Sequence, residues 1–402
     1  MRLAAIALVA AMALGTGARA QTTPPAGAAP PATVRAAVLR VDAPHLPPIS
    51  RLDTPPEDLG MAGARLAIGD NDTTGRFMGQ DFEAVEVIAT PATAGAELAR
   101  LLDAGIPFIV TLADDAQTLA LADQAGARAL IFNARARGDR LRGADCRFNV
   151  IHTAPSHAML ADGLAQFLMW KKWPRWMLIS GSHPQDVALA DAYRRAATKF
   201  GAKIVEQRTY EDTGGGRRSD TGHVQVQAQM PVFTQDAPRH DVVIAADETG
   251  VFAQWLPYQT WDPRPVAGSA GLVPRSWHAS LEAWGAMQFQ NRFEALAHRP
   301  MHEEDYQTWL ALRAIGEAAT RGASADPATI RDFLLSDRFE VAGFKGQKLT
   351  LRDWDHQLRQ PILLATGDVT ASVSPQDQYL HQSSALDTLG IDRPETECSF
   401  RR

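Results

Sequence analysis

Small polar and charged side chains follow almost every predicted strand of this chain, at the point where the strand ends. Carboxylates, hydroxyls, amides and a guanidinium in such positions suit hydrogen bonding to a small polar molecule. In an open sheet of parallel strands the carboxyl ends lie along one edge, and ligands bind in the crevice outside that edge. The sequence therefore predicts a ligand-binding site that draws on these residues. They are Thr111, Asp114, Asp115, Asn133, Arg135, Thr153, Ser182, His183, Asp247, Glu248 and Ser269.

Helix capping is the alternative explanation for the same residues, because strand-to-helix loops are rich in side chains that accept hydrogen bonds from free backbone N–H groups. Asp114, Asp186 and Asp247 each stand where a helix is expected to begin. Among the candidates, Arg135 and Glu248 carry full and opposite charges. We expect them to face each other across a cleft, so that one binds an acidic group of the ligand and the other a basic or hydroxyl group.

Motifs of catalysis and of cofactor binding are missing from the sequence. It has no His-Glu-x-x-His and no Gly-x-Ser-x-Gly, and the glycine run 214–216 is followed by Arg217 and Arg218 instead of the Lys-Ser or Lys-Thr of a P-loop. No Gly-x-Gly-x-x-Gly follows a predicted strand, and the histidines lack the spacing of metal ligands. We therefore expect a protein that is not an enzyme and has no cofactor, no catalytic residues and no metal site.

The only cysteines of the chain are Cys146 and Cys398. Residues 1–20 match the pattern of a cleavable export signal, with one early arginine, an apolar run over 3–14 and Ala18-Arg19-Ala20 before the cleavage point. In an oxidising compartment the two cysteines form either one long-range disulfide or two free thiols, and the disulfide is the favoured alternative. The apolar run is too short to span a bilayer, so we expect an exported protein with no membrane insertion.

Strand-like and helix-like segments alternate twice along the chain, which is typical of βαβ units on a parallel sheet. The first series has strands at 34–41, 82–89, 108–112 and 129–132 with helices at 57–68, 94–103 and 115–124. The second has strands at 149–153, 176–180, 203–210, 242–245 and 266–268 with helices at 159–171, 186–200 and around 251–258. Helices then follow at 281–296, 303–320 and 327–335, and strands at 348–351 and 361–365, with Gly367-Asp368 as a turn signal.

The length of 402 residues and a hydrophobic content of 45% allow two cores of ordinary domain size. We expect an α/β protein of two lobes, each a doubly wound, mostly parallel sheet flanked by helices. The net charge of −6 makes nucleic acid or an anionic membrane surface an unsuitable partner. Residues 21–32, rich in proline, alanine and threonine, are expected to form a disordered leader.

Several stretches of the sequence resemble the type I periplasmic solute-binding proteins, the Leu/Ile/Val-binding group, over essentially the whole chain after residue 20. They are LAIGDNDTTGRFMG at 66–79, where that family has its first helix and the glycine turn after it, RWMLISGSH at 175–183 and DPATIRDFL at 326–334. A second set resembles the subgroup encoded beside pyrroloquinoline-quinone (PQQ)-dependent alcohol dehydrogenases and a small ABC transporter. It comprises NDTTGRF at 71–77, GADCR at 143–147, MPVFTQD at 230–236, TWDPRPVAGSAGL at 260–272 and FKGQKLT at 344–350.

The resemblance implies a periplasmic protein that closes on a small molecule by hinge motion and delivers it to an ABC transporter permease, with a PQQ-dependent dehydrogenase as a possible further partner. Lobe 1 is expected at 33–152 and 276–350, lobe 2 at 153–275 and 351–382, and a C-terminal tail at 383–402. The alternatives from other classes are an accessory or sensor subunit for a periplasmic quinoprotein dehydrogenase and an exported hydrolase, for which no nucleophile–base pair is evident.

The chain departs from the amino-acid-binding pattern at two strand ends. Where the family has small hydroxyl residues that hold the ligand carboxylate, this sequence has Ala113-Asp114-Asp115 and Asn133-Ala134-Arg135. Because an acidic pair repels a carboxylate, either Arg135 takes over this role or the ligand is not a simple amino acid.

Two further groups of residues leave alternatives open. The arginines Arg135, Arg137, Arg140, Arg142 and Arg147 form either a receptor for a multiply charged anion such as PQQ or, as the favoured interpretation, a solvated rim partly neutralised by Asp139 and Asp145. The aromatic residues Trp255, Tyr258 and Trp261 are candidates for stacking on a ligand or for packing in the core.

Overall fold

The computed structural model describes residues 32–214 and 225–400. Its first sheet has five parallel strands in the order β2-β1-β3-β4-β5. The central strands β3 and β4 are buried along their whole length, as expected where helices cover both faces of a parallel sheet. The strands are β1 (Ala32–Val41), β2 (Gln80–Ala89), β3 (Phe108–Leu112), β4 (Leu130–Asn133) and β5 (Val150–His152).

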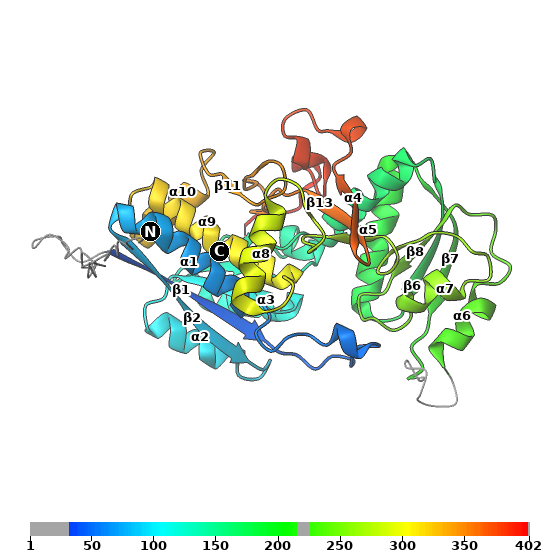
Figure 1. The fold of residues 1–402 in the computed structure, drawn as a ribbon, viewed down its shortest axis with the longest axis horizontal. Helices are drawn as coiled ribbons and strands as arrows, with labels where there is room; N and C mark the ends of the chain where they lie inside the picture. The colour runs from blue at the N-terminus through cyan, green and yellow to red at the C-terminus, as the bar shows by residue number, and fades with distance from the viewer. Residues whose placement is uncertain (1–31, 215–224, 401–402) are drawn as a thin grey trace, which may run out of the picture. The chain divides into compact units, whose positions relative to one another are not determined.

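Helices from both ends of the sequence cover this first sheet (Figure 1). Successive side chains of β1 point to opposite faces, so that Val38 joins one core and Leu39 joins the other. One face is covered by α2 (Ala94–Asp103) and α3 (Asp115–Ala125), and the other by α1 (Met61–Met78), α8 (Ala286–Ala297), α9 (Glu303–Arg321) and α10 (Pro327–Leu334). The late helices therefore complete the first half of the fold, and α9 lies along α1.

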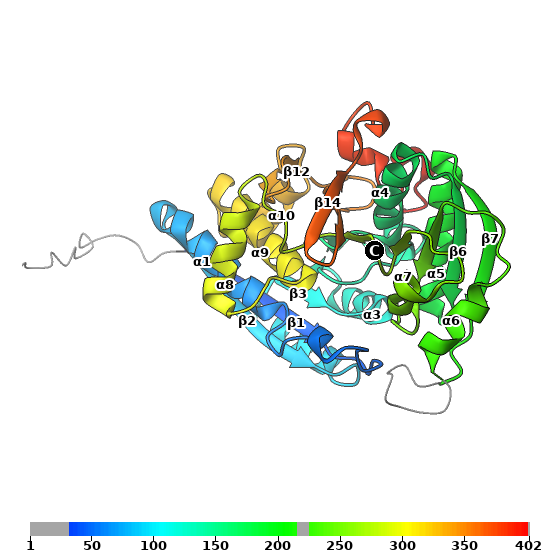
Figure 2. The ribbon, with the colours of Figure 1, turned by 45° about the vertical axis from the view of Figure 1, so that its right-hand side comes forward.

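The second sheet has four parallel strands in the order β7-β6-β8-β9. Figure 2 shows α5 lying along it. The strands are β6 (Arg175–Gly181), β7 (Lys203–Tyr210), β8 (Val242–Ala246) and β9 (Val266–Gly268). One face is covered by α4 (His157–Trp170) and α5 (Pro184–Phe200), and the other by α6 (Val226–Thr234), the 3-10 turn η3 (Ala253–Trp255) and α7 (Leu256–Gln259).

A third, antiparallel sheet joins the two halves. It consists of β10 (Val273–Arg275), β13 (Ile362–Thr366) and β14 (Val369–Ser374), and the turn between β13 and β14 contains the predicted Gly367-Asp368. Leu363 packs in the core of the first half, whereas its neighbours Ile362 and Leu364 pack in the core of the second. One strand thus contributes alternate side chains to both cores. A short ladder of β11 (Val341–Ala342) and β12 (Lys348–Leu349) precedes it.

The predicted fold class is confirmed, and most elements lie within a few residues of their predicted bounds. None of the helices in the described ranges is both long and apolar enough to cross a membrane. The contacts of the described chain from Ala32 onward form one unit, so the lobe boundaries inferred from the sequence stay a prediction. The export signal, almost all of the leader, and Arg217 and Arg218 lie outside the described residues.

Two predicted helix starts were wrong. Helix α1 begins at Met61 instead of residue 57, and it continues to Met78, well beyond the predicted end at residue 68, before Gly79 ends it in a left-handed turn. A Cβ atom on Gly75 would lie 2.6 Å from the carbonyl oxygen of Gln80, so this glycine permits close packing inside a helix. Helix α8 begins at Ala286 instead of residue 281, because Trp284 and Gly285 adopt positive φ angles that interrupt a right-handed helix.

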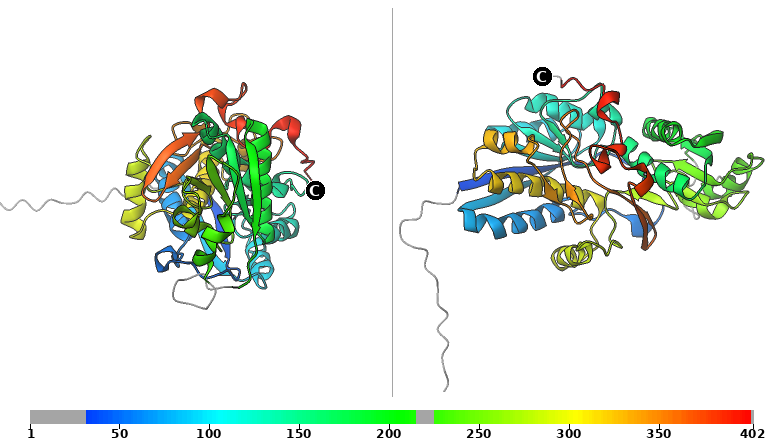
Figure 3. Two further views of the ribbon diagram at one scale, coloured as in Figure 1. Left: turned by 90° about the vertical axis from the view of Figure 1, so that its right-hand side faces the viewer. Right: turned by 90° about the horizontal axis from the view of Figure 1, so that it is seen from above.

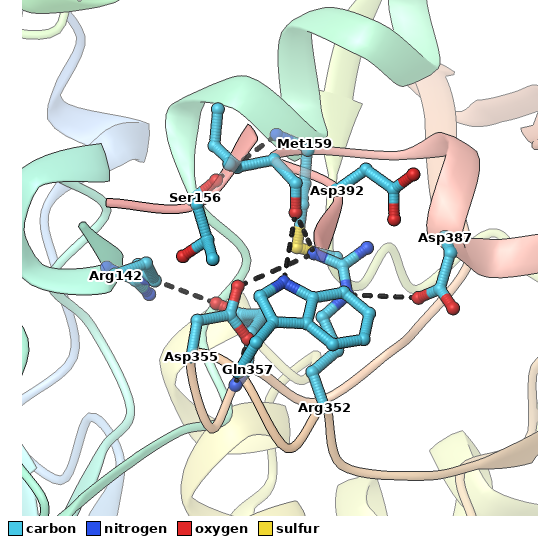
Figure 4. Close-up of polar contacts among 12 residues, drawn as sticks. Arg142, Ser156, Met159, Arg352, Asp355, Gln357, Asp387 and Asp392 are labelled. Carbon is cyan, nitrogen blue, oxygen red and sulfur yellow. Dashed lines mark hydrogen bonds and ion pairs between the residues drawn. The ribbon is translucent and has the colours of Figure 1, made fainter. Parts of the chain in front are cut away.

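Buried amide side chains connect the segments that cross between the halves. The Gln357 Nε2 group donates hydrogen bonds to the carbonyl oxygens of His152 and Ala154, and its Oε1 accepts one of 2.9 Å from Arg142 (Figure 4). Gln360 donates a 2.6 Å hydrogen bond to the carbonyl oxygen of Thr153. These bonds satisfy buried backbone carbonyl oxygens where the chain leaves the sheet at β5.

The C-terminal segment, from Asp387 onward, contacts the second half of the fold before it reaches Cys398. Asp162 of α4, fully buried, accepts hydrogen bonds from Arg195, Lys199 and the backbone N–H of Gly390. The buried guanidinium of Arg352 holds the same segment through the Asp387 carboxylate and the backbone.

The C-terminal end of the chain then returns to the first half (Figure 3). There the predicted disulfide between Cys146 and Cys398 is present. Cys146 lies between the 3-10 turn η2 (Asp139–Arg142) and β5. The C-terminal segment therefore connects both halves, by hydrogen bonds at one end and by a covalent bond at the other.

Replacing both cysteines, as Cys146→Ser with Cys398→Ser, should lower the free energy of unfolding by about 2–5 kcal/mol, because the cross-link restricts the unfolded chain across 252 residues. Denaturant unfolding followed by tryptophan fluorescence measures the change. The wild-type protein, unfolded without reductant, should contain no reactive thiol. An unchanged unfolding free energy in the double variant would contradict the stabilising role.

Candidate functional site

One cleft collects charged side chains from the ends of strands in both parallel sheets. It encloses about 500 Å³ of space, including its open mouth. Arg135 and Arg137 follow β4 of the first sheet, Glu248 follows β8 of the second, and Glu303 begins α9. The full lining is Ala134, Arg135, Arg137, Ala154, Pro155, Glu248, Ser276, Glu303, Glu304 and Gln307.

The loop that carries the two arginines is held by Asn133, the last residue of β4. The buried Asn133 Oδ1 accepts hydrogen bonds from the backbone N–H groups of Arg135 and Ala136, and its Nδ2 donates to the carbonyl oxygen of Ala136. Further along, the backbone N–H of Gly138 donates to Asp115. The amide side chain thus shapes the backbone while the guanidinium of Arg135 projects outward and is exposed.

Glu303 is the most fully paired carboxylate of the cleft. Its Oε1 accepts a 3.0 Å hydrogen bond from Arg275, and its Oε2 accepts bonds from the backbone N–H and hydroxyl of Ser276. The Arg137 guanidinium lies 3.3 Å away. Burial acts to raise the pKa of Glu303, but Arg137 and Arg275 outweigh it, so that the pKa lies below its usual value.

Glu248 contacts two cationic groups from different parts of the fold. Its carboxylate lies 3.8 Å from Arg137 of the first half and 3.7 Å from the ring of His157 at the start of α4. Burial acts to raise the pKa of Glu248, whereas His157 and Arg137 lower it, and the result is a pKa of about 2. The ring of His157 is buried, which alone would lower its pKa, but Glu248 raises it above the usual value. The attraction between the two groups therefore favours the charged form of each.

Some polar groups of the cleft have no partner within the described part of the chain. The buried Oε1 of Gln307 accepts no hydrogen bond. No hydrogen bond or ion pair within the described ranges involves the side chains of Arg135 or Glu304. In contrast to Glu303, these groups remain available to a ligand.

Arg135 and Glu248 are the two predicted site residues that the structure brings to this cleft. They lie on opposite halves, although Arg137 and not Arg135 makes the ion pair with Glu248. Whether either residue contacts a ligand stays a prediction.

The other predicted residues of the first half, and Thr153, have structural partners instead of lining the cleft. Thr111 and Thr153 are buried and donate to backbone carbonyl oxygens. Asp114 caps α3 by accepting from the backbone N–H of Gln117, as the capping alternative expected. Asp115 and Asn133 bind the arginine loop described above.

In the second half, the remaining predicted residues form two local groups. His183 lies 2.9 Å from Asp212, whose backbone N–H donates to Ser182. Asp247 is buried and accepts from three successive backbone N–H groups of residues 251–253, while its own N–H donates to Ser269. These contacts order the loops after β6 and β8 and so place Glu248.

The five arginines of residues 135–147 form only in part the solvated rim that the sequence favoured. Arg140 is exposed and pairs with Asp145, as expected, but Asp139 instead accepts a hydrogen bond from a backbone N–H. Arg142 is buried, so its assignment to the rim was wrong; Gln357 and backbone carbonyl oxygens surround it, and burial lowers its pKa to about 10. Arg147 pairs with Asp123.

The three aromatic candidates for ligand stacking do not line this cleft. Tyr258 is 85% exposed, and Trp261 lies beside Asp236 and Asp262 in a separate depression. Trp255 packs against the core of the second half.

Reasoning from strand ends missed most of the cleft residues. Arg137 stands two positions beyond Arg135, and His157, Glu303, Glu304 and Gln307 lie on helices. The paired acids Glu303-Glu304 at a helix start are a signal in the sequence, but this signal is also expected from the favourable placement of acids at helix N-termini. Their convergence with Arg137 depends on the return of α9 to the first sheet.

The profile of the periplasmic binding protein family matches residues 54–372, and the chain belongs to this family. Proteins of this family are exported to the periplasm and bind substrates without acting as enzymes. A comparison with curated protein sequences gives no match.

Solved structures with the same fold include a branched-chain amino acid ABC transporter periplasmic ligand-binding protein from Burkholderia xenovorans LB400, with a TM-score of 0.70, 16% identity and coverage of 91% of this chain and 99% of that one. The closed Leucine-, isoleucine-, valine-, threonine-, and alanine-binding protein from Brucella ovis has a TM-score of 0.68, 15% identity and coverage of 92% and 99%. An R. palustris solute-binding protein in complex with benzoate has a TM-score of 0.63, 14% identity and coverage of 91% and 99%. At these identities the similarity shows the fold alone.

His157 gives a test of the ion cluster through pH. Because its folded pKa is raised, its contribution to stability is complete below the unfolded pKa of about 6.5 and is lost as pH rises through the folded pKa. Glu248 stays charged over this window, since its contribution is lost only as pH falls toward its own pKa of about 2. His157→Gln should therefore lower the melting temperature most below pH 6.5 and progressively less at alkaline pH.

The exposed His45 serves as the control, because His45→Gln should change the melting temperature little at any pH. A stability difference between wild type and His157→Gln that does not vary with pH would show that His157 is not charged in the folded protein.

Proposed function

We propose that this protein is the substrate-binding component of an ABC-type transport system and that it binds a small polar ligand in the cleft around Arg137. The observation that supports this most is the origin of the lining residues. Arg137 pairs with Glu303 on its own half and with Glu248 on the other, so a ligand placed there contacts both halves at once. Closure of two lobes on such a ligand is a hinge motion that a membrane permease can detect.

Within this proposal, Arg135 and Glu248 bind the ligand directly. Glu304 and Gln307 join them, because the Glu304 carboxylate and the Oε1 of Gln307 accept no hydrogen bond from the described residues. Thr111, Asp114, Asp115, Asn133, Thr153, Ser182, His183, Asp247 and Ser269 act by ordering the loops that carry the binding residues.

The assignment to export and to PQQ-dependent alcohol oxidation rests on the sequence motifs alone. On that basis, the protein is exported by cleavage of residues 1–20, works in the periplasm and takes part in PQQ-dependent alcohol oxidation by handling a small molecule of that pathway. Loss of growth on short alcohols after gene deletion, restored by the intact protein, would support this link.

Arg135→Ala and Glu248→Ala should each weaken binding of the ligand about tenfold to a hundredfold, which corresponds to the roughly 1.5–3 kcal/mol of a charge-assisted hydrogen bond. Isothermal titration calorimetry with a ligand found by thermal-shift screening measures the change. Arg100 on α2 is the matched control, since it is exposed and pairs with its neighbour Glu97 on the same helix. Wild-type affinity in both cleft variants would place the binding site elsewhere.

We expect the chain to cross between the halves three times, near 151–154, 272–276 and 348–354. Ligand binding should also reduce the radius of gyration in small-angle scattering, because three such crossings permit a hinge motion between the halves. Arg135→Ala, at ligand concentrations that saturate only the wild type, serves as the control and should keep the unliganded profile. A wild-type profile that does not change on saturation would favour a static accessory subunit over a transport component.

A further inference from the structure

The cleft has no aromatic or large aliphatic side chain in its lining against which a hydrocarbon side chain could pack. Its apolar lining consists of Ala134, Ala154 and Pro155, and the remaining lining residues are charged or polar. A leucine side chain or a benzene ring placed here would remove water from charged groups without making compensating hydrogen bonds. The chemistry of the ligand must therefore come from its polar atoms.

The polar groups still free in the cleft are mostly hydrogen-bond acceptors. Gln307 offers a buried Oε1 without a donor, and the Glu304 carboxylate has no partner in the described ranges. The Glu248 oxygens lie 3.7 and 3.8 Å from their cationic neighbours, beyond ordinary hydrogen-bond length, so they can still accept hydrogen bonds. The guanidinium of Arg135 is the hydrogen-bond donor of the lining that makes no hydrogen bond or ion pair in the described ranges.

The charges around the cleft are of both signs. Arg135 and Arg137 face Glu248, Glu303 and Glu304, and Arg275 and His157 lie beside Glu303 and Glu248. A simple anion or a simple cation would therefore meet groups of its own sign. A ligand that brings N–H donors with a positive charge to the carboxylates, and an acceptor to Arg135, satisfies both the charge and the hydrogen-bond balance.

Resting on the function proposed above, we infer that the cleft selects a small hydrophilic zwitterion with an ammonium or guanidinium group and no hydrocarbon side chain. Its cationic end binds among Glu248, Glu304 and the Oε1 of Gln307, and its anionic end binds Arg135. Gln307 determines specificity, because only a ligand with a donor at this position satisfies its buried oxygen.

Four probes separate this class from its alternatives in isothermal titration calorimetry at pH 7: guanidinoacetate, leucine, benzoate and glycerol. Guanidinoacetate should bind saturably, and the other three should bind at least tenfold more weakly. Glu304→Gln and Gln307→Leu should each reduce the affinity for guanidinoacetate by tenfold or more. Glu282→Gln is the matched control, since Glu282 is exposed and does not line the cleft, and it should leave the affinity unchanged.

Failure of guanidinoacetate to bind, or tighter binding of leucine, benzoate or glycerol, overturns the inferred class. Unchanged guanidinoacetate affinity in Glu304→Gln, a substitution of a partly exposed side chain that should not affect folding, overturns the assigned contacts. The proposed function itself fails separately, if a ligand obtained by screening binds with an affinity that depends on neither Arg135 nor Glu248.

Discussion

Arg137 carries one positive charge between two carboxylates that come from different parts of the chain. Glu303 lies 3.3 Å away at the start of α9, and Glu248 lies 3.8 Å away after the last strand residue of β8. Neither carboxylate is fully solvated, and a charge removed from water is tolerated only where it is paired. The arrangement of the cleft depends on this pairing, because removal of the arginine would leave acidic groups of both halves facing each other.

The strength of the cluster differs between its members. Glu303 makes bonds to Arg275 and Ser276 in addition to Arg137, and its side chain is 11% exposed, so it is a fixed part of the site. Glu248 is 32% exposed and makes only the two longer contacts, and water therefore screens its interactions more strongly. Such a weak connection between the halves is compatible with the hinge motion proposed above.

The crossing region limits how the halves can move. Gln357 and Gln360 satisfy backbone carbonyl oxygens of residues 152–154, and β13 supplies alternate side chains to both cores. The C-terminal segment adds a further connection, since its hydrogen bonds to Asp162 hold it on one half and Cys398 fastens it to the other. A movement that separates these segments would break buried hydrogen bonds.

Local patterns were enough to predict much of the secondary structure. The bounds of α2, β3, β7 and β9 follow from hydrophobic patterning and from turn residues close in sequence, and the observed bounds agree. The starts of α1 and α8 were wrong because they depend on backbone conformations at positions such as Gly285, which the hydrophobic pattern does not report. Pairing of Cys146 with Cys398 was predictable because the chain contains no other cysteine.

The candidate site was predictable only in part. Strand-end residues are recognisable from the sequence, and Arg135 and Glu248 do reach one cleft. The sequence could not separate them from Asp114 or Asn133, because the same side chains cap helices and hold loops. The sequence by itself determined the alternation of strands and helices and the supply of polar groups at strand ends, since both are local properties. Only the tertiary structure decided which of those groups meet Glu303, Glu304 and Gln307, because α9 returns to the first sheet from a distant part of the chain and brings them to Arg137.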